Sequence, residues 1–425
     1  MRSCQSQATF VQIERTFNFS AILAKLPGPS IVGMYTRIQT IGVFREFMLK
    51  FSRVSPSIVF TVLVIGVGLI SGCAGQTIGG PFAAEFVYVA TGGSIAQYAV
   101  NTSGQLSPLT PAEVITKVTT TPLVVTHPVW VTASKDAKYS YAANKTEGTI
   151  SQYSISTSGG LISLTPAFVT SGTAPVAVEV TPNSKFVYCL NQTDNTITQF
   201  AVGTTGTLSA LAPASVAVPA DGDGLIISPN GSFLYASSYS SSKITAFAIG
   251  ANGQLTPLTV PDYSAPLAGG CMSFSPDGKF LYVPLSATGV AQFSVGLDGA
   301  LTPLSPATVS GSIAGPTGAA DAFAVSPDGK FGYLGLFHGG TPGSPVDQFS
   351  IAVNGTLSSL APTSVAAGNA PNWIIAEPAG HYLFVANQND HTISEFLVGL
   401  DGTLSPESPA FVTPTGALQM TVITR

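Results

Sequence analysis

Hydrophobic and polar residues alternate over short runs that recur from about residue 86 to the C-terminus. One such unit contains four runs, Cys271–Ser275, Lys279–Pro284, Val290–Val295 and Ala300–Leu304. Their length, their period of two and their content of Val, Phe, Tyr and Thr are typical of β-strands. Ser275-Pro276-Asp277-Gly278 separates the first two runs and indicates a tight turn, because its glycine tolerates positive φ. The unit therefore predicts four antiparallel strands joined by hairpins.

The same unit occurs seven times. An aromatic residue closes a strand-like run at intervals of 47 to 53 residues, at Tyr88, Tyr141, Tyr188, Tyr235, Tyr282, Tyr333 and Phe384. A second aromatic follows in each copy, and then a glycine turn with a leucine close behind it, such as Gly299 and Leu301. One four-stranded sheet cannot bury both of its faces, so the copies must stack around an axis. The sequence thus predicts an all-β fold, a seven-bladed β-propeller of four-stranded antiparallel blades.

The two ends of the repeated region predict how the ring closes. The first unit begins at Phe86, directly on its second strand, and the run Ala417–Ile423 is an additional first strand after the seventh unit. We expect this C-terminal strand to complete the blade begun at Phe86–Val100, so that no sheet edge stays open. Trp130 and Trp373 are followed by Val and Ile instead of Asp, which disfavours a WD40 array.

Charge divides the chain near residue 72. Residues 1–72 carry seven basic and two acidic residues, whereas residues 73–425 carry nine basic and nineteen acidic ones. Lys50 and Arg53 precede the apolar run Ile58–Ile70, whose thirteen residues are too few to span a bilayer comfortably. Small residues, Ser71-Gly72-Cys73, follow the run. A basic start, a short apolar stretch and small residues before a cut are the form of an export signal.

The stretch Leu69-Ile70-Ser71-Gly72-Cys73 resembles the lipobox of bacterial lipoproteins. The resemblance implies that Cys73 is acylated and becomes the new N-terminus, which attaches the protein to a membrane of the bacterial cell envelope, facing the periplasm or the cell surface. A plain signal peptide, which would give a secreted protein, or an uncleaved anchor is the alternative. Residues 1–47 fit no export pattern, so we expect an over-long start assignment, a signal peptide over 48–72, a linker over 73–85 and the propeller over 86–425.

Composition excludes several classes of function. Charged residues make up 9% of the 425 residues and hydrophobic residues 45%, which excludes a disordered chain. Arginine occurs only at positions 2, 15, 37, 45, 53 and 425, so the protein lacks a basic face for nucleic acid. No phosphate-cradling glycine loop, nucleophile elbow or zinc-ligand spacing is present. We expect no cofactor, no metal ion and a monomer.

The repeats resemble a known family. Ser275-Pro-Asp-Gly-Lys-Phe-Leu-Tyr-Val283 and Ser326-Pro-Asp-Gly-Lys-Phe-Gly-Tyr333, with the run Tyr382–Phe396, are similar to the lactonase-type seven-bladed propellers and their YVTN-repeat relatives. The resemblance covers about residues 86–425. The family includes 6-phosphogluconolactonases and a fungal muconate-lactonising enzyme, which implies a lactonase with histidine, arginine and acidic residues around the central channel.

This sequence departs from the family's enzymes where the chemistry would take place. No arginine lies between residues 54 and 424, so an anion clamp of the usual residue type is missing. The Pro-His pair that enters a first strand in the enzymatic members is represented only by the reversed pair His127-Pro128. The sequence therefore leaves open whether the protein is an enzyme.

Residues that break the repeat are the candidates for a site, because a repeated residue usually serves the fold. Three insertions break the repeat, and the expected strand order places all of them on one face of the ring. They are Thr110–His127, Ser305–Asp321 and Leu336–Pro345. His127 and His338 lie in them as candidate catalytic bases, and Asp221 and Asp223 enter from the same face as candidate ligand-binding groups. Together they could hold a water or a metal ion. A solvated turn is favoured over a metal site, since no two histidines have a ligand spacing.

Two Asn- and Asp-rich segments have a structural interpretation. Asn191–Asn195 and Asn387–His391 occupy equivalent loops between the second and third strands, and we expect their side chains to cap those turns.

Three functions remain open. The first is a lipid-tethered, non-catalytic binding module for a glycan, a peptide or a partner protein. The second is a divergent lactonase or related hydrolase outside the cytoplasm, and the third is an extracellular scaffold. The regular repeats and the scarcity of charge favour the binding module.

Overall fold

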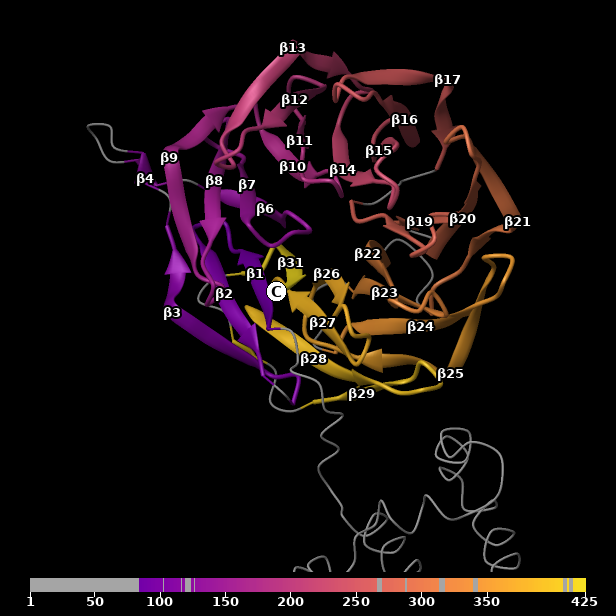
Figure 1. Ribbon diagram of the computed structural model, residues 1–425. Coiled ribbons are helices and arrows are strands. Elements are labelled where there is room, and N and C mark those ends of the chain that lie inside the picture. Colours follow the sequence, from indigo (N-terminus) through magenta and orange to yellow (C-terminus); the bar gives the residue numbers. More distant parts are fainter. Residues whose placement is uncertain are drawn as a thin grey trace, which may run out of the picture. The chain divides into compact units, whose positions relative to one another are not determined.

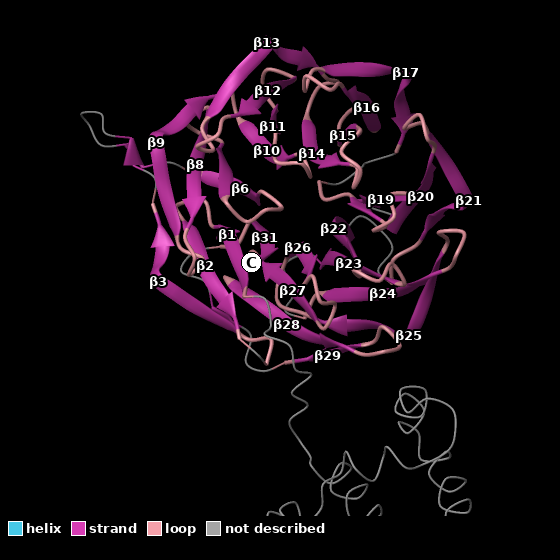
Figure 2. Cartoon of the chain, viewed as in Figure 1, coloured by secondary structure: helices cyan, strands magenta, loops and turns pink. Residues whose placement is uncertain are grey.

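The computed structural model describes residues 84–425, apart from 102, 116, 119–123, 126, 266–269, 287–288, 313–317, 339–342, 408–410 and 413–415. All regular structure in this part of the chain is β-strand (Figure 2). None of the described residues forms a helix that is long and apolar enough to cross a membrane. The predicted leader, Cys73 and most of the linker lie outside the described residues.

Seven sheets surround a central axis and form the predicted seven-bladed propeller (Figure 1). In each blade the first strand is innermost and the fourth is outermost.

From inside to outside, blade 1 consists of β31 (Gln419–Thr424), β1 (Glu85–Ala90), β2 (Ile95–Val100) and β3 (Leu106–Val114). Blade 2 is β6 (Pro128–Ala133), β7 (Tyr139–Asn144), β8 (Thr149–Ile155) and β9 (Leu161–Thr170), and blade 3 is β10 (Pro175–Val180), β11 (Phe186–Asn191), β12 (Thr196–Val202) and β13 (Leu208–Ala217). Blade 4 is β14 (Gly222–Ile227), β15 (Phe233–Ser238), β16 (Lys243–Ile249) and β17 (Leu255–Ser264), and blade 5 is β18 (Ser273–Phe274), β19 (Phe280–Leu285), β20 (Gly289–Val295) and β21 (Leu301–Val309). Blade 6 is β22 (Gly318–Val325), β23 (Phe331–His338), β24 (Pro345–Ile351) and β25 (Leu357–Ala366). Blade 7 is β26 (Pro371–Ala376), β27 (Tyr382–Asn387), β28 (Thr392–Val398) and β29 (Leu404–Pro406), with β30 (Phe411–Val412) also paired to β28, and a small hairpin, β4 (Lys117–Val118) and β5 (Val124–Val125), is inserted between blades 1 and 2.

The predicted closure of the ring is confirmed. β31 pairs antiparallel with β1 along its whole length, from Glu85 opposite Thr424 to Ala90 opposite Gln419. The fourth strands are longer than the sequence pattern predicted; β21, for example, continues from Leu301 to Val309. The reason is a register shift in the pairing of β21 with β20, between Ala291 and Phe293. The backbone pairing continues on the far side of this shift.

The repeated tyrosine and glycine join neighbouring blades. In six blades the hydroxyl of the second-strand tyrosine donates a hydrogen bond to the carbonyl of the glycine turn in the next blade, at 2.7–3.0 Å, from Tyr88 to Gly159 through Tyr333 to Gly402. Each turn glycine has positive φ and lies so close to an aromatic ring of the preceding blade that a Cβ would overlap the ring. The repeat that defines the sequence is therefore the contact between blades.

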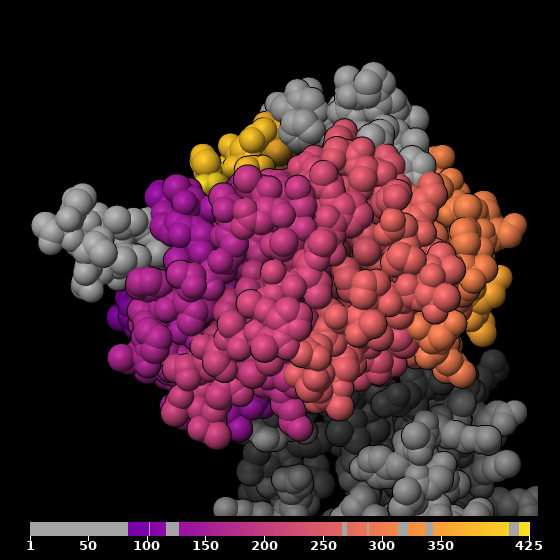
Figure 3. Space-filling model, turned by 90° about the horizontal axis from the view of Figure 1, so that it is seen from above, coloured from indigo at the N-terminus to yellow at the C-terminus, as the bar shows by residue number. Residues whose placement is uncertain are grey.

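A glutamine in the third strand makes a second contact of this kind. The side chain of Gln199 donates to the carbonyl of Pro213 in its own blade and accepts a hydrogen bond from the amide of Leu255 in the next. Four other glutamines, Gln97, Gln152, Gln292 and Gln348, make the same pair of bonds. The core accordingly lies between the blades, where Tyr88 of blade 1 packs with Val131 of blade 2. Figure 3 shows the blades side by side around the rim in their sequence order.

The strand order gives the ring two different faces. The turns between first and second strands and between third and fourth strands lie on one face, which we call the turn face. The loops between second and third strands and the connections between blades lie on the other, the loop face. β1 enters from the turn face, because Phe86 packs against Gly159 in the turn of blade 2.

Removal of the closing strand should destabilise the protein strongly. Deletion of residues 419–425 leaves the inner edge of β1 without a partner strand and removes the buried side chains of Met420 and Ile423, each worth about 1.5–3 kcal/mol. We expect the melting temperature to fall by several degrees in a thermal unfolding experiment. Thr421→Val, which keeps the backbone pairing, should melt close to the wild type. A truncated protein with an unchanged melting temperature would show that β31 does not close the ring.

Candidate functional site

Two tryptophans meet in the central channel. Trp130 on β6 and Trp373 on β26 belong to blades 2 and 7, and their ring centroids lie 4.6 Å apart in an edge-to-face arrangement. They are the only tryptophans of the chain. The contact joins two blades that are separated by blade 1, so it narrows the channel from within.

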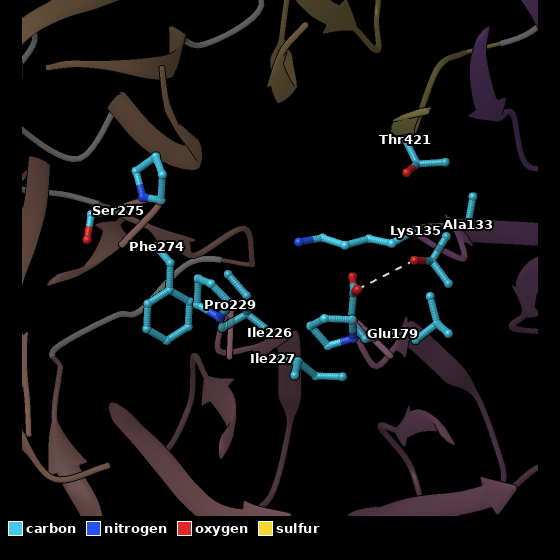
Figure 4. A pocket seen from close by; sticks show the side chains of 13 residues that line it. Ala133, Lys135, Glu179, Ile226, Ile227, Pro229, Phe274, Ser275 and Thr421 are labelled. Atoms are coloured by element: carbon cyan, nitrogen blue, oxygen red, sulfur yellow. Dashed lines mark hydrogen bonds between the residues drawn. The ribbon is translucent and has the colours of Figure 1, made fainter. Parts of the chain in front are cut away.

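A cavity of about 430 Å³ lies beside this contact, at the turn-face end of the channel. Residues of blades 1 to 5 line it, mostly at the ends of the first strands and in the turns that follow (Figure 4). The wall combines apolar side chains, among them Ile226, Ile227 and Phe274, with polar ones such as Thr421. A small-molecule site commonly has this size and character.

Glu179 on β10 is the acidic group of the cavity. The indole Nε1 of Trp130 donates a hydrogen bond to Glu179 Oε1 at 3.2 Å. The hydroxyl of Thr132 donates to Oε2 at 3.5 Å, which is the hydrogen bond marked in Figure 4. Glu179 is half-buried, with part of its side chain facing the cavity, and the surrounding protein partly desolvates the carboxyl group. This desolvation raises the pKa of Glu179 to about 8, and the two hydrogen bonds only partly oppose it. The group is therefore mainly protonated at neutral pH.

Lys135 is the basic group of the cavity. It lies in the turn after β6, and its side chain extends into the space between Glu179 and Phe274 (Figure 4). Because Glu179 is mainly protonated at pH 7, the ammonium group of Lys135 is the charged group among the residues that line the cavity.

Lys135 and Glu179 were not among the site residues expected from the sequence, although the sequence contains a signal for both. The position of Lys135 is occupied by proline in the equivalent turns of blades 3 to 7, at Pro182, Pro229, Pro276, Pro327 and Pro378. Glu179 is the only charged residue at its position among the seven first strands, where the others are Thr132, Ile226, Ser273, Ala324, Ile375 and Thr421. Both residues break the repeat, but they do so without an insertion.

The predicted histidines lie on the loop face, at the other end of the channel. His127 precedes β6, and its Nδ1 lies 2.5 Å from Glu147 Oε1 in the loop between β7 and β8. The amide of His127 also donates to this carboxylate, at 3.0 Å. His338 ends β23, and its side chain lies outside the described residues. The structure therefore shows His127 in an ion-pair geometry with its own blade and leaves its catalytic role a prediction.

Asp221 and Asp223 are joined to the preceding blade. The side-chain amide of Gln192 donates to both, at 3.1 Å to Asp221 and 3.2 Å to Asp223, and the amide of Tyr239 donates to Asp223 at 2.9 Å. Gly224 follows them because a Cβ there would overlap the carbonyl of Gly270 in blade 5. These contacts give the Asp-Gly-Asp-Gly segment a role in joining blades 3 to 5.

The Asn- and Asp-rich loops do form capping hydrogen bonds through their side chains, but these cap the connections between blades and not the loops' own turns. Asn191 accepts hydrogen bonds from Ser171 and Gly172, and Asp194 accepts one from the amide of Thr173. Asn387 and Asp390 cap the equivalent connection of blade 7. Among the described residues, no three His, Cys, Asp or Glu side chains come together as ligands for a metal ion.

Comparisons with known proteins agree with this architecture. The model of the family "Lactonase, 7-bladed beta-propeller" matches residues 84–223 and 271–418. A search of curated proteins finds no match.

Solved structures of this fold resemble the chain at low sequence identity. A Bacteroides fragilis protein provisionally named a 6-phosphogluconolactonase is 22% identical, with a TM-score of 0.67 over 83% of this chain and 100% of that one. The Pseudomonas aeruginosa periplasmic gluconolactonase is 19% identical, with a TM-score of 0.63 over 80% of this chain and 99% of that one. At such identities the likeness shows the fold alone.

Proposed function

The chain belongs to the lactonase family of seven-bladed β-propellers, and from this premise we propose that it is an exported, lipid-anchored binding module. Its ligand is a small molecule, or the end of a peptide or glycan, that carries one carboxylate on an apolar body. The observation that carries the proposal is the channel cavity, in which one ammonium group, from Lys135, lies among apolar side chains and the protonated carboxyl of Glu179.

The size and charge of the cavity support this class of ligand. A volume of about 430 Å³ suits a small molecule or a chain terminus and is too small for a folded partner. A carboxylate can pair with Lys135, and the carboxyl of Glu179 and the hydroxyl of Thr421 can satisfy further polar atoms of the ligand. A phosphate dianion is a poorer fit, because residues 54–424 contain no arginine.

Hexanoate and hexanol are suitable probes, because they differ mainly in charge. We expect hexanoate to bind more tightly, with a change in the fluorescence of Trp130, which contacts Glu179. Lys135→Met should weaken hexanoate binding about tenfold, equivalent to ~1.4 kcal/mol, whereas Lys138→Met, in the same turn but paired with Asp136, should not. Above pH 8 Glu179 ionises and offsets the charge of Lys135, so the affinity should fall there, and Glu179→Gln should abolish this fall. Equal binding of hexanoate and hexanol by the wild type would contradict the proposal.

Hydrolysis of a neutral lactone is the second candidate function, and the pKa of Glu179 favours it. A carboxyl group with a pKa of about 8 can act as a general acid at neutral pH and as a general base as the pH approaches 8. We expect no turnover of 6-phosphogluconolactone above the spontaneous rate, because its phosphate needs more cationic donors than Lys135 supplies.

The same assay with unphosphorylated gluconolactone separates the candidates. If this substrate is hydrolysed, loss of activity in Glu179→Gln would place the reaction in the cavity, and loss in His127→Ala or His338→Ala would place it on the loop face. Robust turnover of the phosphorylated substrate would contradict the electrostatic argument.

Acylation of Cys73 is expected from the apolar run and the small residues before it. Mass spectrometry of the protein from a bacterial host with lipoprotein processing should show a mature N-terminus at a lipid-modified Cys73. Cys73→Ser should leave the N-terminal signal unprocessed and the protein unmodified. An unlipidated wild-type chain beginning at Met1 or Met48 would contradict the anchor.

A further inference from the structure

Three aliphatic side chains on the turn face are fully exposed. Leu297, Val353 and Leu400 occupy the same position in the turns after the third strands of blades 5, 6 and 7, and their exposed fractions are 104%, 102% and 106%. Single exposed aliphatic residues are common on protein surfaces. Here the same tip position is apolar on three consecutive blades, which places the three side chains in an arc along one side of the face. We call these three residues the apolar arc.

The fold does not require apolar residues at this position. The equivalent tips of blades 2, 3 and 4 carry Thr157, Thr204 and Ala251. In the arc itself the residue after the tip stabilises the turn. Asp298 and Asp401 do so by accepting hydrogen bonds from the backbone amides of Ala300 and Thr403. The tip side chain is therefore free of structural contacts, and the presence of a large aliphatic residue at three of the six described tips calls for another explanation.

The chain enters the propeller from the face that carries the arc. β1 begins at Glu85 on the turn face, and the amide of Arg425 donates to the carbonyl of Ala84 there. Cys73 precedes Ala84 by eleven residues, which span at most about 40 Å when fully extended. Blade 7, with Leu400, is the neighbour of blade 1. An acyl group on Cys73 would therefore keep this face, and this side of it, near the bilayer.

The two faces also differ in charge. After Cys73 the loop-face segments carry three lysines, whereas the turn-face segments carry five lysines and Arg425, and the nineteen acidic residues divide about equally between the two faces. Three of the turn-face acids pair with lysines, at 2.9–3.2 Å. Burial, together with the nearby carboxylate of Glu377, raises the pKa of Glu85 to about 8, which leaves one more acid of this face mainly uncharged at neutral pH. An anionic lipid surface should therefore repel the turn face less than it repels the loop face.

We propose that the turn face docks on the surface of a lipid bilayer, with Leu297, Val353 and Leu400 inserted at the boundary between headgroups and acyl chains. The proposal rests on the lipid anchor proposed above. Tethering makes the docking intramolecular and gives the arc a high effective concentration at the membrane, so a small apolar surface is sufficient.

Tryptophan reporters at matched tips can test the docking. In one preparation a histidine tag replaces residues 1–73 and attaches the chain to vesicles of phosphatidylethanolamine and phosphatidylglycerol that carry nickel-chelating lipid. This chain keeps every described residue, and its attachment does not depend on acylation. Nitroxide-labelled lipids should quench Leu400→Trp at least about twofold more than Ala251→Trp, because only the arc reaches the acyl boundary. The background from Trp130 and Trp373 is the same in both variants.

The neighbours of the reporter provide the control. Val353→Trp should be quenched as Leu400→Trp is, and the added substitutions Leu297→Asp and Leu400→Asp should abolish that quenching. Equal quenching of Leu400→Trp and Ala251→Trp would overturn the docking. A blue shift of Leu400→Trp that grows with protein concentration in the absence of vesicles would also overturn it, because a second copy would then cover the arc.

This test separates the docking from the anchor. An unacylated Cys73 in the mass spectrum, together with quenching in the tag-tethered chain, would remove the anchor but keep the docking surface. An acylated Cys73 without quenching would remove the docking surface alone.

Discussion

The ring depends on one contact, the packing of each glycine turn against the blade before it. The glycine at the turn has no Cβ, so an aromatic ring of the preceding blade can lie against its backbone, and a tyrosine hydroxyl can reach its carbonyl. Neither partner can change alone: a side chain at Gly253 would overlap Phe186, and loss of the hydroxyl of Tyr188 would leave a buried carbonyl without its donor. The glutamine of the third strand adds a second bond across the same junction. These requirements recur once per blade and so produce the sequence period.

The glycine packing is kept at every junction, but the hydrogen bonds that accompany it change at two of them. Blade 7 has Phe384 in place of the tyrosine and Glu395 in place of the glutamine. Glu395 still accepts a hydrogen bond from the backbone amide of Leu106, at 3.0 Å. Burial raises the pKa of this carboxyl group. At this junction blade 1 takes its inner strand from the C-terminus, so the ladder between β31 and β1 supplies the stability that side chains supply elsewhere. Blade 4 has Ala246 in place of the glutamine, and the first strand of blade 5 is reduced to Ser273–Phe274.

Much of this architecture could be predicted from the sequence, because the features that hold it together are local and repeated. The seven units, their hairpins and the closing strand all follow from residue types at fixed spacing. The cavity could not be predicted in this way, because Lys135, Glu179 and Thr421 come from three blades and meet only when the ring is closed. The insertions pointed to a site on the loop face, but Asp221 and Asp223 there accept hydrogen bonds from the side chain of Gln192. Single substitutions within otherwise regular turns and strands were the better guide to the cavity.

Repeated residues hold the blades together and unrepeated residues carry the proposed functions, which explains how such a scaffold can change its function. Glycine, tyrosine and glutamine hold the blades together through backbone carbonyls and amides, so neither the channel ends of the first strands nor the tips of the outer turns are needed for stability. Lys135 and Glu179 lie at the channel ends of first strands, and Leu297, Val353 and Leu400 lie at the tips of outer turns. Both sets lie on the turn face, with the cavity lined by blades 1 to 5 and the apolar arc carried by blades 5 to 7. Docking through the arc would therefore hold the cavity beside the bilayer without covering its lining with the inserted tips, and a ligand would be taken up close to the membrane surface.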